Sequence, residues 1–180
     1  MSGAKRTDGL VGAHDACGTS GHRGGGGRLE TVSPEERLLR LGLVLPPLRP
    51  KAGNYLGYVR HGDLLFLSGQ GADGHVGHVG AGRSIEEGRL AARDCMLNLL
   101  AQTRDALGSL DSVGRIIKIL GFVACAPEFR DAPKVIDGAS DLLHELFGPE
   151  RGAHARSAIG ASALPLGFTV EIEMVLSIED

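Results

Sequence analysis

The stretch of sequence that decides the fold lies near the C-terminus, where residues 155–161 read ARSAIGA and residues 168–178 read FTVEIEMVLSI. Both segments have the composition of β-strands, and Pro165-Leu166-Gly167 separates them. In the second segment, apolar side chains alternate with Glu171 and Glu173. This alternation predicts a strand with one face in the core and the other face turned to polar surroundings or to a partner.

The preceding part of the chain predicts three more strands and two long helices. A hairpin is expected over residues 55–68, with its turn at His61-Gly62-Asp63, and a buried strand over residues 115–125. Apolar residues at helical spacing predict long helices over residues 84–107 and 131–147.

Two capping boxes mark the starts of helices. Ser84-Ile85-Glu86-Glu87 opens the first long helix, and Ser33-Pro34-Glu35-Glu36 opens a short helix near the start of the main segment. The expected apolar positions include Leu90 in the long helix and, in and just after the short one, Leu38, Leu39, Leu41 and Leu43. A short helix followed by the order β-β-α-β-α-β-β predicts an α/β (α+β) fold, a mixed sheet with both long helices packed on one face.

The composition is that of an ordinary globular protein, and 180 residues favour one domain. A net charge of −3, 4% aromatic residues and no Trp disfavour binding to nucleic acid. No apolar run reaches the roughly 20 residues of a membrane-spanning helix, so no membrane partner is expected. Three scattered cysteines, Cys17, Cys95 and Cys125, favour a reducing compartment, the cytoplasm, and we expect Cys95 and Cys125 to be inert core residues.

Residues 1–30 differ from the rest in being rich in glycine and poor in large apolar side chains, and they include the run Gly24 to Gly27. Such a segment buries too little surface to offset its conformational entropy. The sequence therefore predicts a disordered tail over residues 1–30, followed by a single domain over residues 31–180.

One histidine pair suggests a metal site at first sight. His75-Val76-Gly77-His78 places two imidazoles three residues apart, but a metal ion needs at least a third ligand, and only Asp73 lies nearby. We expect a surface loop here and no bound metal.

Arg156 is the most informative single residue, because it stands among small and apolar neighbours in a predicted strand. Burying an unpaired guanidinium is costly, so Arg156 should meet a carboxylate. That carboxylate belongs either to Glu171 or Glu173, in a purely structural pair, or to a ligand. The residues alone leave both alternatives open.

These segments resemble the RidA/YjgF family over residues 33–180. Tyr55 and the run Gly62 to Gln70 are similar to its N-terminal signature. Residues 155–160, Leu164-Pro165 and residues 170–173 are similar to its C-terminal signature. Residues 125–129 and 137–143 resemble a longer YjgF-like branch of that family.

The resemblance implies a chorismate-mutase-like fold and a homotrimer with ligand clefts between subunits. It also implies cofactor-independent hydrolysis of 2-imino acids, such as 2-iminobutanoate, to 2-keto acids and ammonia. By resemblance, Arg156 binds the substrate carboxylate and Glu171 positions the attacking water. Tyr55 lies near the imine, the backbone at Ala158 holds the imine nitrogen, and Ser68 in the N-terminal signature is a further substrate-binding residue.

The sequence departs from the family pattern at two places. Ala158 stands where many members have cysteine, and the asparagine that many deaminases carry on the last helix has only Asp137 or Ser140 near its position. The leading hypothesis is an imine deaminase. The alternative is a non-catalytic protein that binds small keto acids through Arg156. RNA cleavage is disfavoured by the low aromatic content and the negative net charge.

Overall fold

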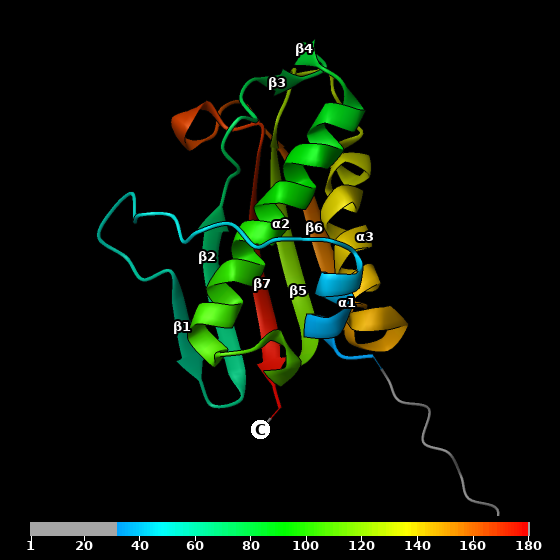
Figure 1. Cartoon of the computed structure of the whole chain (residues 1–180). Helices are drawn as coiled ribbons and strands as arrows, with labels where there is room; N and C mark the ends of the chain where they lie inside the picture. The colour runs from blue at the N-terminus through cyan, green and yellow to red at the C-terminus, as the bar shows by residue number, and fades with distance from the viewer. Residues whose placement is uncertain (1–31, 180) are drawn as a thin grey trace, which may run out of the picture. The chain divides into compact units, whose positions relative to one another are not determined.

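A five-stranded mixed sheet forms the centre of the computed structural model, which describes residues 32–179 (Figure 1). The strands follow one another across the sheet in the order β1 (Tyr58–His61), β2 (Leu64–Gln70), β7 (Val170–Ile178), β5 (Val113–Ala124) and β6 (Ala155–Ala161). β5 and β6 are parallel, and the other neighbouring strands are antiparallel. β6 is therefore an edge strand that carries the predicted Arg156 site. The predicted tail lies outside the described residues.

Two long helices, α2 (Ile85–Leu107) and α3 (Ala132–Arg151), cover one face of this sheet, as the order of elements predicts (Figure 1). The short helix α1 (Pro34–Arg40) packs beside α3. Between β2 and α2 lie two short strands that the sequence did not predict, β3 (His78–Val79) and β4 (Gly82–Arg83), and single turns of 3-10 helix occur at Leu110–Ser112 and Pro165–Gly167. No helix within residues 32–179 has the length and apolarity needed to span a bilayer.

The helix ends follow local chemistry. The capping box at Ser84 is complete, because Ser84 Oγ accepts from the Glu87 amide while the Glu87 carboxylate accepts from the Ser84 amide. At the other end of α2, Gly108 takes the left-handed backbone conformation that glycine tolerates best (φ 82°). Gly148 (φ 78°) interrupts α3, but the chain resumes a helical turn and continues to Arg151. The regular helix therefore ends at the predicted residue, Phe147, and a short further turn follows the break at Gly148.

Two expectations about apolar stripes were wrong. Of the predicted apolar residues, Leu38 is buried, but Leu39 is 77% exposed and Leu41 is 46% exposed. Adjacent residues lie about 100° apart around a helix, and only the face that carries Leu38 packs on the core. Leu90 of α2 is 57% exposed as well. β1 begins at Tyr58, so the residues from Tyr55 onward remain an irregular segment before the sheet.

The core lies between the sheet and the two long helices, and it includes both described cysteines. Cys95 on α2 is fully buried, and burial raises the pKa of its thiol. Cys125, directly after β5, is 9% exposed. Both are free thiols in apolar surroundings, as expected for inert core residues.

The strand register decides which side chains face the helices. Ile119 of β5 is paired with Arg156 on one side and with the buried Met174 on the other. Directly paired residues project to the same face, so Arg156 points to the helix-covered face. Phe122 is paired with Glu171, and since it lies three positions from Ile119 it points to the opposite face. That second face is covered by none of the described helices (Figure 1).

Candidate functional site

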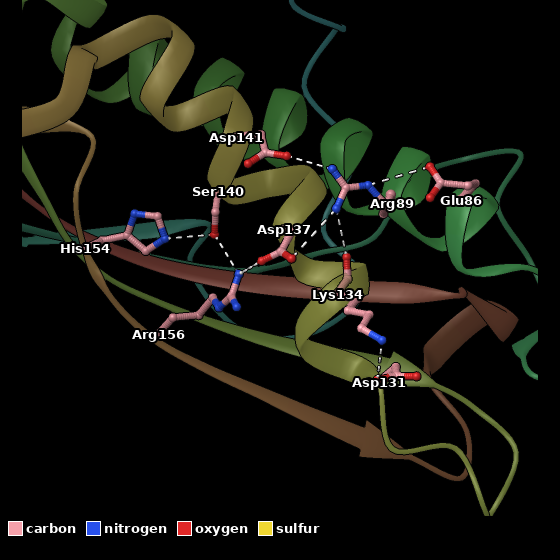
Figure 2. Close-up of polar contacts among 9 residues, drawn as sticks. All are labelled: Glu86, Arg89, Asp131, Lys134, Asp137, Ser140, Asp141, His154 and Arg156. Carbon is pink, nitrogen blue, oxygen red and sulfur yellow. Dashed lines mark hydrogen bonds and ion pairs between the residues drawn. The ribbon is translucent and has the colours of Figure 1, made fainter.

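Arg156 is held against α3 by two hydrogen bonds from one nitrogen (Figure 2). Its Nη1 donates to Asp137 Oδ1 at 2.7 Å and to Ser140 Oγ at 3.0 Å. These bonds use both hydrogens of Nη1. The Nε–Nη2 edge of the guanidinium contacts no acceptor among residues 32–179. This edge has the geometry that binds a carboxylate through two parallel hydrogen bonds, and Arg156 is thus oriented with that edge available.

Asp137 lies between two arginines, as Figure 2 shows. Its second oxygen, Oδ2, lies 3.8 Å from Nη1 of Arg89 on α2, and Arg89 is also paired with Asp141 at 2.7 Å. Gly138 permits this arrangement, because a Cβ there would lie only 2.1 Å from the Arg89 carbonyl oxygen. The close packing of α2 on α3 therefore keeps Asp137 in place between Arg89 and Arg156.

His154 completes a chain of hydrogen bonds that leads to Arg156 (Figure 2). Its Nδ1 lies 2.6 Å from the Gly152 carbonyl oxygen, which can only accept, so Nδ1 carries the proton. Its Nε2, 3.1 Å from Ser140 Oγ, then accepts from the Ser140 hydroxyl. Burial, with smaller contributions from the charges of His144 and Arg156, lowers the pKa of His154 and favours this neutral form.

Ala158 projects from β6 to the same face as Arg156, two residues further along the strand. Its paired residue on the neighbouring strand is Gly121 of β5. The two residues beside Arg156 toward the end of β6 are therefore an alanine and a glycine. The sequence predicted that small neighbours would leave room beside the guanidinium, but a Cβ at Gly121 would lie only 2.5 Å from Cδ1 of Ile136, so α3 packs closely over this pair. Arg156, Ala158, Asp137 and Ser140 thus form one cluster, which we call the arginine site.

Glu171 and Tyr55 belong to a second cluster on the other face, around a pocket of about 370 Å³ that we call the glutamate pocket. Its wall also includes Arg49, Gly69, Leu166 and Phe168. The Glu171 carboxyl lies directly against Gly69, since a Cβ at that position would lie 2.3 Å from Oε1. Glycine is therefore required at the end of β2 for the carboxyl to occupy this place.

The Glu171 carboxyl is half-buried and receives no hydrogen bond from residues 32–179. Burial raises its pKa above the ordinary value of glutamate, and the charge of Glu173 adds to the effect. A carboxyl with a raised pKa in a pocket can take up and release a proton nearer to neutral pH. This is the property expected of a group that activates water.

Arg49 is a residue of the glutamate pocket that the sequence analysis missed. It donates to the Gly71 carbonyl oxygen at 3.0 Å and to Asp73 Oδ1 at 2.8 Å, and its guanidinium lies 4.7 Å from the centre of the Phe168 ring. These contacts fasten the proline-rich segment before β1 to the rim of the sheet. No periodic pattern marks an arginine in such a segment, so only its charge could have drawn attention to it.

Ser68 does not line either cluster within one chain. Its hydroxyl donates to the Leu56 carbonyl oxygen at 2.7 Å and its amide donates to the Gly57 carbonyl oxygen. These bonds anchor the irregular segment that carries Tyr55. Ser68 thus supports the wall of the glutamate pocket from behind.

A structural ion pair between Arg156 and Glu171 or Glu173, one of the two alternatives left open by the sequence, was wrong. The two glutamates project to the open face of the sheet, whereas Arg156 projects to the helix-covered face. The carboxylate that Arg156 meets is Asp137, which comes from the helix packed above β6. Alternation within a strand places residues on faces, but it does not tell which helix lies over an edge strand.

The histidine loop is held by pairs rather than by a shared centre. His75 Nε2 lies 2.7 Å from Asp94 Oδ2 on α2, and His78 Nε2 lies 2.9 Å from the Ser162 carbonyl oxygen. Within residues 32–179, no group of three or more His, Cys, Asp or Glu side chains could hold a metal ion.

Comparison with known proteins finds a matching family and several similar chains. Residues 35–176 match the family described as "YjgF/chorismate mutase-like, putative endoribonuclease". Protein TCP17 of Trypanosoma cruzi is 40% identical over 148 residues, which cover 79% of this chain and 92% of that protein. The RutC family protein y4sK of Sinorhizobium fredii is 30% identical over 127 residues, covering 70% and 88%. The crystal structure of Atu1372 from Agrobacterium tumefaciens, a protein of unknown function, is similar with 38% identity and a TM-score of 0.74, covering 81% and 92%.

Proposed function

Because the chain belongs to the YjgF/chorismate mutase-like family, we propose that it hydrolyses small 2-imino acids to 2-keto acids and ammonia. In this reaction water adds across the C=N bond, and the resulting carbinolamine releases ammonia to leave the ketone. The substrate supplies a carboxylate for recognition and an electrophilic carbon for attack. The protein has to bind the carboxylate and position a water molecule beside the imine carbon.

The observation that carries the proposal is the state of Glu171. Its carboxyl is half-buried, has a raised pKa, receives no hydrogen bond from the described residues and lies in a pocket with Tyr55. An ionised Glu171 would accept a proton from water as the water attacks the imine carbon, and then return a proton to the departing nitrogen. The open edge of Arg156 is the complementary element that would bind the substrate carboxylate.

The two clusters lie on opposite faces of one sheet, so a single chain does not bring them together. We propose that Arg156 of one copy and Glu171 of a neighbouring copy form one site in a homotrimer. Exposed apolar side chains on the open face support this association, namely Val59 (50% exposed), Phe66 (43%) and Ile159 (50%). A monomer seldom leaves such residues gathered on one sheet face. The two cysteines within residues 32–179 are free thiols, which is compatible with the proposed cytoplasmic location.

A non-catalytic protein that binds keto acids is the second candidate, and one observation favours it. The arginine site is complete within one chain, with Arg156 oriented by Asp137 and Ser140, whereas the glutamate pocket is on the other face. Such a protein would bind 2-ketobutyrate with no turnover of the imine.

The direct test generates 2-iminobutanoate from threonine in a coupled assay and follows 2-ketobutyrate release with and without the purified full chain. The proposal predicts faster release with the protein, and unchanged release at saturating protein would reject it. Light scattering at micromolar concentration should give the mass of a trimer. A monomeric mass would reject the shared site.

Complementation tests the shared site more sharply. Arg156→Ala and Glu171→Gln each remove one half of the shared site, so a homotrimer of either variant should be inactive. A trimer that mixes the two variants contains one site with both native residues. Co-expression in equal amounts should therefore restore about one quarter of the wild-type activity, since about three-quarters of the trimers are mixed and each has one intact site in three.

A further inference from the structure

A second pocket lies behind the irregular segment that forms a wall of the glutamate pocket. It has a volume of about 410 Å³ and is bounded by residues 48–57, by β1 and by the C-terminal half of α2. Figure 1 shows this segment, in cyan, crossing α2 and then turning back toward β1. Neither Arg156 nor Glu171 contributes to this pocket. The side chains that matter here are Leu48, Lys51, Leu56, Tyr58, Gln102 and Asp105.

Gln102 of α2 lines this pocket and carries an unsatisfied acceptor. The residue is only 8% exposed, and no donor within residues 32–179 reaches its Oε1 atom. A buried carbonyl oxygen without a hydrogen bond is destabilising, so a bound group that donates to it is favoured. The pocket is several times larger than one water molecule needs, and it lies in the size range of small-molecule sites.

A negative charge lies one helical turn further along α2. Asp105 Oδ2 accepts from the Tyr58 hydroxyl at 3.2 Å, which leaves Oδ1 available to a second donor. Gln102 and Asp105 are three residues apart on one helix, so both acceptors face the same side. Together they suit an ammonium group, which has three hydrogens to donate.

The remaining lining distinguishes an amino acid from a simple amine. Lys51 provides a positive charge that would repel a bare amine but would pair with a carboxylate. Leu48 (49% exposed) and Leu56 (59% exposed) offer apolar surface that the chain itself leaves open.

From these groups we infer that the second pocket binds an aliphatic α-amino acid. The ammonium group donates to Gln102 Oε1 and Asp105, the carboxylate pairs with Lys51, and the side chain packs on Leu48 and Leu56. Arg49 lines both this pocket and the glutamate pocket, and the segment 48–57 separates them.

The test is calorimetric titration of the full chain with L-leucine, with 4-methylpentanoate, which lacks the ammonium group, and with 3-methylbutylamine, which lacks the carboxylate. L-leucine should bind at millimolar concentration or below, and both analogues should bind at least about tenfold more weakly. An absence of heat with L-leucine at millimolar concentration, or equal affinity for 4-methylpentanoate, would overturn the inference.

Two variants locate the binding. Gln102→Leu removes the unsatisfied acceptor without removing bulk, so the fold should persist, and affinity for L-leucine should fall by about tenfold or more. Leu90→Gln, an exposed position on the same helix, is the matched control and should bind as the wild type does. Wild-type affinity in Gln102→Leu, checked by an unchanged melting curve, would reject the site.

The last arm separates this inference from the proposed reaction. Glu171→Gln and Arg156→Lys should bind L-leucine as the wild type does, and 2-ketobutyrate should not displace it. Displacement by 2-ketobutyrate would mean that L-leucine occupies the arginine site or the glutamate pocket, and would reject the second pocket. A protein that binds L-leucine here but has no deaminase activity would support the inference and reject only the proposed function.

Discussion

Asp137 Oδ1 lies 2.7 Å from Nη1 of Arg156, so the cation proposed to bind the substrate already has a carboxylate beside it. The pair is partly exposed, with side chains 24% and 40% accessible, and Arg89 lies on the other side of Asp137. Asp137 therefore has two opposing effects on a ligand. It orients the guanidinium, and it weakens the positive potential that an incoming carboxylate meets.

Asp137→Asn separates the two effects. The amide oxygen can still accept from Nη1, but the negative charge is gone, so 2-ketobutyrate should bind several-fold more tightly, by about 1 kcal/mol. Stability should change little, because Arg89 keeps Asp141 and exposed ion pairs contribute about 0–1 kcal/mol. Titration calorimetry measures the affinity, with Asp141→Asn as the control. Weaker binding in Asp137→Asn would show that orientation by the charge outweighs the loss of potential.

Arg156→Lys keeps the positive charge but loses the planar edge that binds a carboxylate through two bonds. We expect kcat/KM to fall by an amount that corresponds to a loss of about 1.5–3 kcal/mol of transition-state stabilisation. This is the usual contribution of a hydrogen bond to a charged group. The control is Arg93→Lys, which changes an arginine paired with Glu145 on the outer surface of the helices. Equal losses in the two variants would point to a general effect on the fold.

Glu171→Gln should lower kcat by about 10²- to 10⁴-fold while the affinity for 2-ketobutyrate stays nearly unchanged. Glu173→Gln is the matched control on the same strand. It should keep most of the activity and shift the acidic limb of the pH–rate profile to lower pH, because the charge of Glu173 contributes to the raised pKa of Glu171.

Glu171→Gln should also change the stability of the folded chain, in a direction that depends on pH. Burial raises the pKa of Glu171 in the folded chain, so the folded state holds this proton more tightly than the unfolded state does. The benefit is fully present below the pKa of an unfolded glutamate, about 4.3, and is lost as the pH rises through the folded pKa. Glu171→Gln should therefore melt at a higher temperature than the wild type at pH 8, and the difference should shrink toward pH 4. A large loss at pH 8 would indicate a structural role.

His154 should make ligand binding depend on pH. The pKa of His154 is lowered in the folded chain. The contribution of the neutral imidazole to folding stability is therefore fully present above about pH 6.5, the pKa of an unfolded histidine, and is lost as the pH falls through the folded pKa. Protonation makes Nε2 a donor, prevents Ser140 from donating to it, and adds a positive charge next to Arg156. Affinity for 2-ketobutyrate should rise as the pH falls through the folded pKa of His154, because the added positive charge attracts the carboxylate, and His154→Gln should flatten this dependence. His61→Gln, which changes an exposed histidine at the end of β1, is the control, because His61 lies far from β6 in the sheet.

The sequence predicts the elements well where one strong local pattern decides them. The bounds of β6 match the prediction, and the alternation in β7 correctly separates its buried residues from Glu171 and Glu173. The cap at Ser84 places the start of α2 because one hydroxyl and one carboxylate satisfy amides only three residues away. Such patterns depend on neighbours in the chain and can be recognised without the fold.

The parts that could not be predicted depend on contacts between distant segments. Asp137 and Ser140 reach Arg156 because α3 crosses back over β6, and the register of that crossing has no signature in either segment. Arg49 reaches the glutamate pocket from an irregular segment, where no periodicity indicates a direction. Leu39 is exposed because only the face of α1 that carries Leu38 packs on the core, and a run of neighbouring leucines does not reveal which face that is.

The placement of Arg156 and Glu171 on opposite faces has a kinetic consequence for a site shared between copies. Each chain would fold and keep both half-sites at any dilution, but whole sites would exist only in the associated fraction. Specific activity would then fall with dilution along the same curve as the mass measured by light scattering, while circular dichroism stayed constant. Loss of activity on dilution would thus report subunit dissociation in a protein whose individual chains remain fully folded.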